Sequence, residues 1–100
     1  MENTIYANDT IYVNDIELRG FIVHKYEAPK ATIITLSTGK SSDVVNYPKI
    51  VLFGNLIEQA KQFNVHDNVT ITANVQSSRK EEGSKQFYVQ SLFGETISPT

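Results

Sequence analysis

Aromatic and cationic side chains alternate with aliphatic ones in the segment 47–53, which reads YPKIVLF. In a β-strand, alternate side chains point to opposite faces, so Tyr47, Lys49 and Phe53 share one face. The aliphatic residues between them take the other face. Rings spaced around a cation suit a polymer with flat bases and a charged backbone. The spacing therefore predicts a platform on which single-stranded nucleic acid stacks.

Each of these side chains also has a purely structural explanation. Phenylalanine is among the most buried residue types, so Phe53 in a VLF run could belong to the core. Lys49 could be a solvated strand charge. Tyr47 stands beside a proline at the strand entrance, a place that is rarely central to a core. The face that Phe53 shares with Tyr47 and Lys49 favours stacking.

Further candidates for nucleic-acid contact lie outside this segment. Phe21 is a candidate for an added stacking ring or an oligomer contact. The cations expected to contact phosphate are Arg19, Arg79, Lys80 and Lys85. Glu81 and Glu82 lie beside three of these cations in the sequence, so local salt bridges are the alternative.

Phe87 and Tyr88 are neighbours in a predicted strand and must therefore point in opposite directions. One of them is expected in the core. The other is expected to be exposed or at a subunit contact, and the sequence leaves open which is which.

The elements that position these residues follow from hydrophobic periodicity. Alternation predicts strands over 15–26, 31–38, 47–53, 69–76 and 86–93. Apolar residues at helical spacing predict a helix of about nine residues after Asn55, its expected N-cap. Gly20 in mid-strand predicts a bulge or sharp bend. Polar stretches at 39–45 and 77–85 are expected as a hairpin tip and a loop.

This order predicts the fold class: all-β with one short helix. Five strands with the helix between strands 3 and 4 match the OB-fold, a five-stranded Greek-key barrel. We expect residues 1–13 to form an N-terminal extension, with an extra strand as the alternative to a loosely ordered lead-in, because TIYAND is followed by the near-repeat TIYVND. Residues 14–94 are expected to be the OB-fold domain, and 95–100 a short flexible tail.

Composition excludes several function classes. The net charge of −2 argues against a strongly electrostatic duplex binder, although it leaves room for binding by stacking. The chain has no cysteine, and His24 and His66 lack ligand-spaced partners, so we expect no metal and no cofactor. No catalytic motif appears, which predicts a protein that is not an enzyme. Without an apolar span or a signal peptide, a cytoplasmic location is expected.

The chain resembles the bacterial single-stranded DNA-binding protein family, in a short form such as plasmids and phages carry. The resemblance covers about four-fifths of the sequence. It rests on NDIELRG at 14–20, IITLST at 33–38, KIVLFGNLIEQAKQF at 49–63 and NVTITANVQS at 68–77. It implies that Tyr47 occupies a position where the family often has tryptophan. By the same resemblance, Lys49 occupies a position where the family has arginine, and Phe53 occupies the position of the family's stacking phenylalanine.

Three departures from the family pattern predict weaker binding than that of a chromosomal member. The sequence has no Gly- and Pro-rich linker with an acidic, Phe-terminated tail, so recruitment through such a tail is not expected. It has no tryptophan, and the position that often carries one near Arg79 and Lys80 is polar. The turn before the fourth strand has His66 and Asp67 where the family usually has a basic residue and glycine.

The sequence thus predicts non-catalytic, largely sequence-independent binding of single-stranded DNA in replication, recombination or plasmid or phage DNA maintenance. A homo-oligomer, either dimer or tetramer, is expected, with no membrane partner and no small-molecule substrate. The alternative is an OB-fold protein-interaction or assembly subunit whose aromatic face is covered by a partner chain.

Overall fold

The alternating segments of the sequence form strands in the computed structural model, which describes residues 15–41 and 44–100. The predicted N-terminal extension at 1–13 lies outside the described residues. The elements are β1 (Asp15–Glu27), β2 (Thr32–Ser41), β3 (Val44–Asn46), β4 (Lys49–Leu52), α1 (Asn55–Ala60), β5 (Asn68–Glu82) and β6 (Lys85–Pro99).

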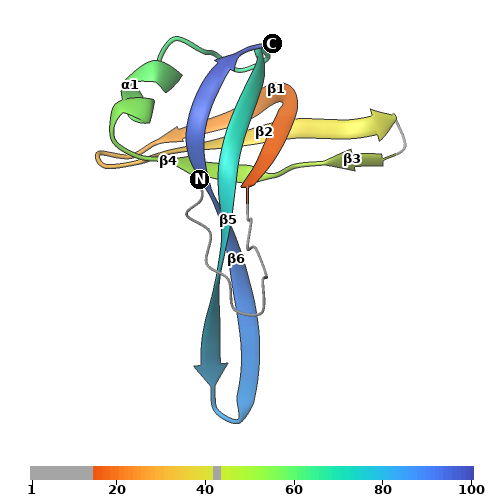
Figure 1. Cartoon of the computed structure of the whole chain (residues 1–100), viewed down its shortest axis with the longest axis vertical. Coiled ribbons are helices and arrows are strands. Elements are labelled where there is room, and N and C mark those ends of the chain that lie inside the picture. Colours follow the sequence, from red (N-terminus) through yellow and green to blue (C-terminus); the bar gives the residue numbers. More distant parts are fainter. Residues whose placement is uncertain (1–14, 42–43) are drawn as a thin grey trace, which may run out of the picture.

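The sheet closes on itself as a barrel (Figure 1). Hydrogen-bonded neighbours follow the order β1, β5, β6, β4, β2, β3, and β1 pairs with β2 as well. The β4–β6 pairing is parallel, whereas the other pairings are antiparallel. α1 follows β4 and packs against the barrel beside β6. This arrangement confirms the predicted OB-fold, a mostly β barrel with one short helix.

The core of the barrel is aliphatic. Its buried side chains are Ile22, Ile34, Leu36, Ile50, Leu52, Ala60, Val69, Ile71, Ala73 and Ile97. None of the aromatic side chains in the part of the chain that the structure describes is buried. Aromatic residues usually supply much of the apolar area inside a domain, whereas here Phe63 packs against the core from a half-buried position.

The third strand is shorter than predicted, because only Lys49–Leu52 of the segment 47–53 form β4. A separate short strand, β3, lies mostly in the stretch 39–45 that was expected to be a hairpin tip. β3 ends at Asn46, so Tyr47 and Pro48 form a break between β3 and β4. Proline has no N–H to donate to a ladder, which explains the interruption. The Pro48 carbonyl still accepts a hydrogen bond from the Leu36 N–H at 3.0 Å, and this bond keeps the break in register with β2.

β1 is irregular at the point where it stops pairing with β5 and starts pairing with β2. The register with β2 shifts between Ile22 and His24, two residues beyond the glycine at which the sequence predicted it. Gly20 has another role, because a Cβ at this position would collide with the Ser37 carbonyl. The missing side chain therefore allows β1 and β2 to approach closely where the barrel closes.

α1 is shorter than predicted and starts differently. It spans Asn55–Ala60, and its N-cap is Gly54 rather than Asn55. Gly54 has a φ of 62°, a conformation that glycine adopts without steric cost. After Ala60 the chain continues with tighter bonds to carbonyls three residues back, which ends the regular helix. No helix within the described ranges is long and apolar enough to cross a membrane.

β5 and β6 are much longer than predicted. Residues 77–85, predicted to be a loop, continue the β5–β6 hairpin, which turns only between Glu82 and Lys85. The predicted tail at 95–100 is also wrong, because β6 runs to Pro99 and Ile97 is buried in the core. We call residues 76–90 the arm; all of them are exposed, and the arm projects from the barrel (Figure 1).

Candidate nucleic-acid interface

The predicted alternation around β4 is present. Ile50 and Leu52 are fully buried, whereas 61% of Tyr47 and 50% of Phe53 are exposed to solvent. Lys49 is exposed on the same side as the two rings. Tyr47 and Phe53 lie just outside the ends of β4, so the short strand and the buried side chains beneath it fix the segment that carries all three groups.

Strand register extends this outer face over β2 and β1. Ser37 pairs with Phe21 across β1 and, by continuation of the β2–β4 register, lies opposite Tyr47. Antiparallel partners share a face of the sheet. The exposed ring of Phe21 therefore lies on the same outer face as Tyr47, as an added stacking ring would.

A further ring, which the sequence did not predict as a site residue, completes the face from the other side. Phe93 in β6 is the register partner of Val51 in β4. The ring of Phe93 is stacked on that of Phe53, with centroids 5.8 Å apart and planes 23° from parallel. We call Phe21, Tyr47, Lys49, Phe53 and Phe93 the platform.

Arg19 lies next to the platform. Together with Phe21 it lines a shallow hollow of about 350 Å³, whose opposite wall is formed by Ser37, Thr38 and Val45. The guanidinium of Arg19 is 3.4 Å from the carboxylate of Glu17, and both side chains are largely exposed. Since exposed ion pairs of this kind are weak, the pair leaves Arg19 available to a phosphate.

The remaining predicted cations lie on the arm rather than on the barrel. Register places Lys80 opposite Phe87 and Lys85 opposite Glu82, on the face that continues toward Phe93. Arg79 pairs with Tyr88 on the other face of the hairpin. Arg79 is also 3.6 Å from Glu81, the local salt bridge weighed as the alternative for this cation.

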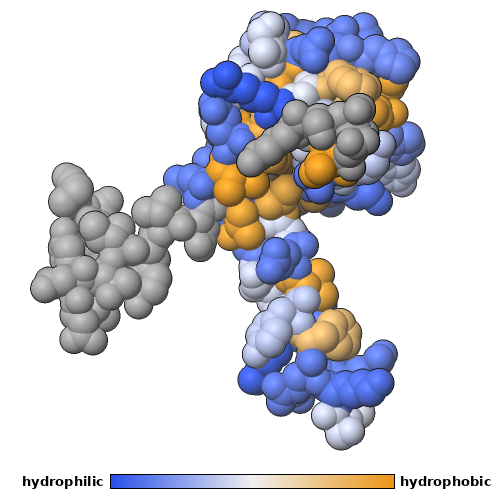
Figure 2. Space-filling model, turned by 90° about the vertical axis from the view of Figure 1, so that its right-hand side faces the viewer, coloured by the Kyte–Doolittle hydropathy of each residue, from blue (hydrophilic) through white to orange (hydrophobic). Residues whose placement is uncertain are grey.

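The expectation that Phe87 or Tyr88 enters the core is wrong. The two side chains point to opposite faces of the arm and are 44% and 68% exposed. The reason is that the hairpin has left the barrel at this point, so neither face has a core to cover. Figure 2 shows apolar surface where the arm leaves the barrel and mostly polar surface, with smaller apolar areas, along the arm.

Lys25 is a supporting residue that the sequence analysis did not identify. Its ammonium donates hydrogen bonds to the carbonyls of Ala60 and Phe63, at 3.0 and 2.8 Å. Only 13% of the side chain is exposed. A cation near the C-terminus of a helix satisfies carbonyls that lack helical partners. Lys25 thereby attaches the end of α1 to β1.

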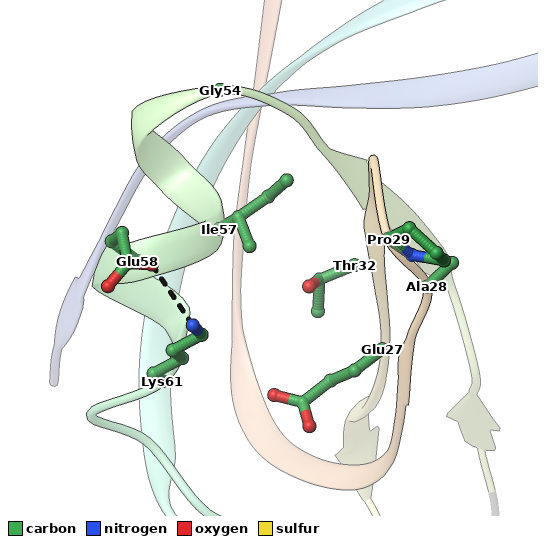
Figure 3. Close-up of a pocket in the computed structure, with 8 residues that line it drawn as sticks. All are labelled: Glu27, Ala28, Pro29, Thr32, Gly54, Ile57, Glu58 and Lys61. Atoms are coloured by element: carbon green, nitrogen blue, oxygen red, sulfur yellow. Dashed lines mark hydrogen bonds and ion pairs between the residues drawn. The ribbon is translucent and has the colours of Figure 1, made fainter.

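A hollow of about 560 Å³ lies at the α1 end of the barrel, between the helix and the β1–β2 turn (Figure 3). Glu27, Thr32 and Ile57 line it, and the ion pair between Glu58 and Lys61 lies at its edge. None of the platform residues lines this hollow. It is therefore distinct from the aromatic face.

Comparison with solved structures shows which proteins share this fold. The mitochondrial single-stranded DNA-binding protein Rim1 of S. cerevisiae matches with a TM-score of 0.75 and 17% identity, over 88% of this chain and 95% of Rim1. The Plasmodium falciparum SSB in complex with ssDNA matches with a TM-score of 0.67 and 11% identity, over 91% and 97% of the two chains.

No protein-family model matches the sequence, and neither does any curated protein. The structural matches show that the chain shares its fold with these two proteins over nearly the whole of their length. The narrower prediction of a short bacterial plasmid or phage member stays a prediction. Within residues 15–41 and 44–100, no three potential ligand side chains gather as a metal site would require.

Proposed function

We propose that this protein binds single-stranded DNA without catalysis and with little sequence preference. The observation that carries the proposal is the separation of side chains at β4: fully buried aliphatics on one face, and two half-exposed rings around an ammonium on the other. Bases of any sequence have a flat face that stacks on such rings. The presence of ssDNA in the structure of the Plasmodium falciparum SSB supports this reading.

In the proposed mechanism the platform holds the bases and nearby cations hold the phosphates. Tyr47 and Phe53 stack on bases, and the contact between Phe53 and Phe93 fixes the orientation of one ring before DNA arrives. Lys49 lies between the rings and pairs with the backbone. Arg19, Phe21 and the arm cations Arg79, Lys80 and Lys85 make secondary contacts.

Titration of the protein with a fluorescent oligo-dT at several salt concentrations tests the proposal. Tyr47→Ala and Phe53→Ala are each expected to weaken binding by about 1 to 3 kcal/mol, the usual contribution of one stacked base. Tyr47→Phe retains the ring and serves as the matched control. Urea unfolding of each variant checks that the barrel is intact.

The same titration can contradict the proposal. Binding that depends on salt is expected because phosphate contacts release counterions. If the wild-type protein shows no salt-dependent affinity for oligo-dT, the platform belongs to a protein-interaction subunit instead. If binding is present but neither ring substitution weakens it, the DNA lies elsewhere on the molecule.

We also propose that the protein acts in the cytoplasm as a homo-oligomer, in replication, recombination or plasmid or phage DNA maintenance. The family resemblance of segments 49–63 and 68–77 supports this part of the proposal. Light scattering on the purified protein should give the mass of a dimer or a tetramer. A mass near 11.2 kDa, that of one chain, at micromolar concentration would contradict it.

A further inference from the structure

The register shift in β1 changes which side chains reach the outer face of the barrel. Ile22 is fully buried opposite Leu36, and the next paired residue is His24, opposite Thr35. Val23 is therefore an extra residue in β1, as in a β-bulge. Beyond the bulge the alternation is reversed, so His24 and Tyr26 are exposed and Lys25 is largely buried.

A strand without the bulge would have the opposite arrangement. Strict alternation from Phe21 would place Val23 and Lys25 outside and turn Tyr26 inward. With the bulge, Lys25 reaches the carbonyls at the end of α1 and 56% of Tyr26 is exposed. Bulges often re-aim a side chain next to a binding site, and this one changes the chemistry of the surface.

Register then places Tyr26 in line with the platform. Tyr26 pairs with Ile33 in β2, and Ile33 pairs with Val51 in β4. Val51 pairs in turn with Phe93 in β6. A single row across four strands therefore carries an exposed tyrosine at one end and the Phe93 ring, stacked on Phe53, at the other.

His24 lies in the adjacent row, with Lys49. Thr35 pairs with His24 on one side and with Lys49 on the other. Two strand spacings separate His24 from Lys49, which is about 10 Å. Thr35 is only 9% exposed, as expected for a short side chain between two longer ones. The imidazole and the ammonium therefore lie on the same face, with rings in the rows beside them.

We propose that the nucleic-acid interface extends across β2 onto the end of β1, where Tyr26 stacks on a base and protonated His24 contacts a phosphate. This inference rests on the proposed function and adds a binding segment to it. Histidine is the side chain whose charge ordinarily changes between pH 5 and 8. Affinity for single-stranded DNA therefore rises as the pH falls through this range.

The strands next to His24 on this face, β2 and β4, contain no carboxylate that would compete with a phosphate for the imidazole. On β4 the group that faces it is Lys49, a cation, and among the described β2 side chains its partner is the uncharged Thr35. Lys25 points away, toward α1, and has Glu27 at 3.8 Å. In the loop before β5, Asp67 already accepts a hydrogen bond from the Asn64 N–H, and His66 is the other titratable group.

The stacking part is tested with Tyr26→Ala in the oligo-dT titration. We expect affinity to fall about 5- to 150-fold, the range for one stacked base, with unchanged urea unfolding. Tyr26→Phe should restore wild-type affinity because it keeps the ring. Wild-type affinity in Tyr26→Ala would overturn this part of the proposal.

The phosphate part is tested by the salt dependence of affinity at pH 8 and at pH 5.5. Each phosphate contact on a single strand adds about 0.7 to the slope of log K against log salt. We expect the wild-type slope to be steeper by about 0.7 at pH 5.5, and the slope of His24→Gln to be equal at both pH values.

His66→Asn is the matched control, because asparagine tolerates the positive φ of 82° at this position. It should keep the wild-type pH dependence. A pH effect that is absent in the wild type, or that survives in His24→Gln, would overturn the role of His24.

The two levels of the proposal fail in different ways. If Tyr47→Ala and Phe53→Ala weaken binding but Tyr26→Ala and His24→Gln do not, the extension onto β1 is wrong and the proposed function stands. If none of these substitutions weakens binding of oligo-dT, the DNA lies elsewhere on the molecule. If the wild-type protein does not bind oligo-dT, the proposed function itself is wrong.

Discussion

The platform and the arm both expose aromatic rings and cations, but they differ in what lies beneath them. Behind the platform, Ile50 and Leu52 are fully buried and hold β4 in the barrel. The arm is a two-stranded ribbon whose residues 76–90 are all exposed. A two-stranded hairpin is marginally stable by itself in water. The platform therefore presents its rings on a packed support, whereas the rings of the arm have no core beneath them and, in the proposed complex, would become ordered as DNA binds.

Because of this difference, substitutions in the two regions should have different effects on the stability of the protein and on binding. Substitutions behind the platform should destabilise the protein, and substitutions on the arm should leave its stability almost unchanged. Ring substitutions on the platform should affect binding more than those on the arm, since ordering the arm uses part of the interaction energy. The following predictions test this contrast, from the largest expected effect to the smallest.

Ile50→Ala should lower the free energy of unfolding by about 2 to 5 kcal/mol, because it leaves a cavity in the aliphatic core. Val89→Ala on the arm is the comparison variant and should change stability by less than about 0.5 kcal/mol. Urea denaturation measures both. Similar losses in the two variants would show that the arm packs against something that supports the fold.

Lys25→Met should cost about 1 to 3 kcal/mol of stability. It keeps much of the apolar stem but leaves the Ala60 and Phe63 carbonyls without the ammonium that now donates to them. Lys80→Met, the same exchange on the exposed arm, should be nearly neutral in urea unfolding. A neutral Lys25→Met would mean that water replaces the ammonium at no cost.

Local alternation was sufficient to predict which side chains around β4 are buried and which are exposed. The pattern of Lys49, Ile50 and Leu52 depends only on neighbouring residues, and a strand with one buried face displays it directly. Phe93 could not be found in this way, because its place beside Phe53 depends on the parallel pairing of β4 with β6. That pairing joins segments about forty residues apart, and no local pattern encodes it.

In the arm, by contrast, the sequence pattern did not predict the strands. Residues 77–85 lack apolar alternation because neither face of the hairpin is buried, so the pattern that reveals a half-buried strand is missing. The strand end at 95–99 was missed for a related reason, since Ile97 is the only core residue in it. In β1, the bulge at Val23 reversed an alternation that was predicted correctly up to Ile22.

Phe87→Ala on the arm should weaken oligo-dT binding by about 1 kcal/mol, near the lower end for a stacked ring. Phe87 pairs with Lys80 on the face that continues to Phe93, whereas Tyr88 points to the other face. Tyr88→Ala should therefore have a smaller effect, although Tyr88 is the more exposed ring. A larger loss with Tyr88→Ala would place the DNA path on the opposite face.

The smallest effect is expected for the cations of the arm, and their two faces again provide the control. Lys80→Gln should reduce the salt slope of oligo-dT binding by about 0.7, the value for one phosphate contact on a single strand. Arg79→Gln should reduce it by less, because Arg79 lies on the other face and is paired with Glu81, which a phosphate would have to displace. Equal reductions would show that DNA contacts both faces of the arm, which a single path leading from Phe93 does not allow. In that case the arm would act as a flexible cationic hairpin that contacts DNA from either side.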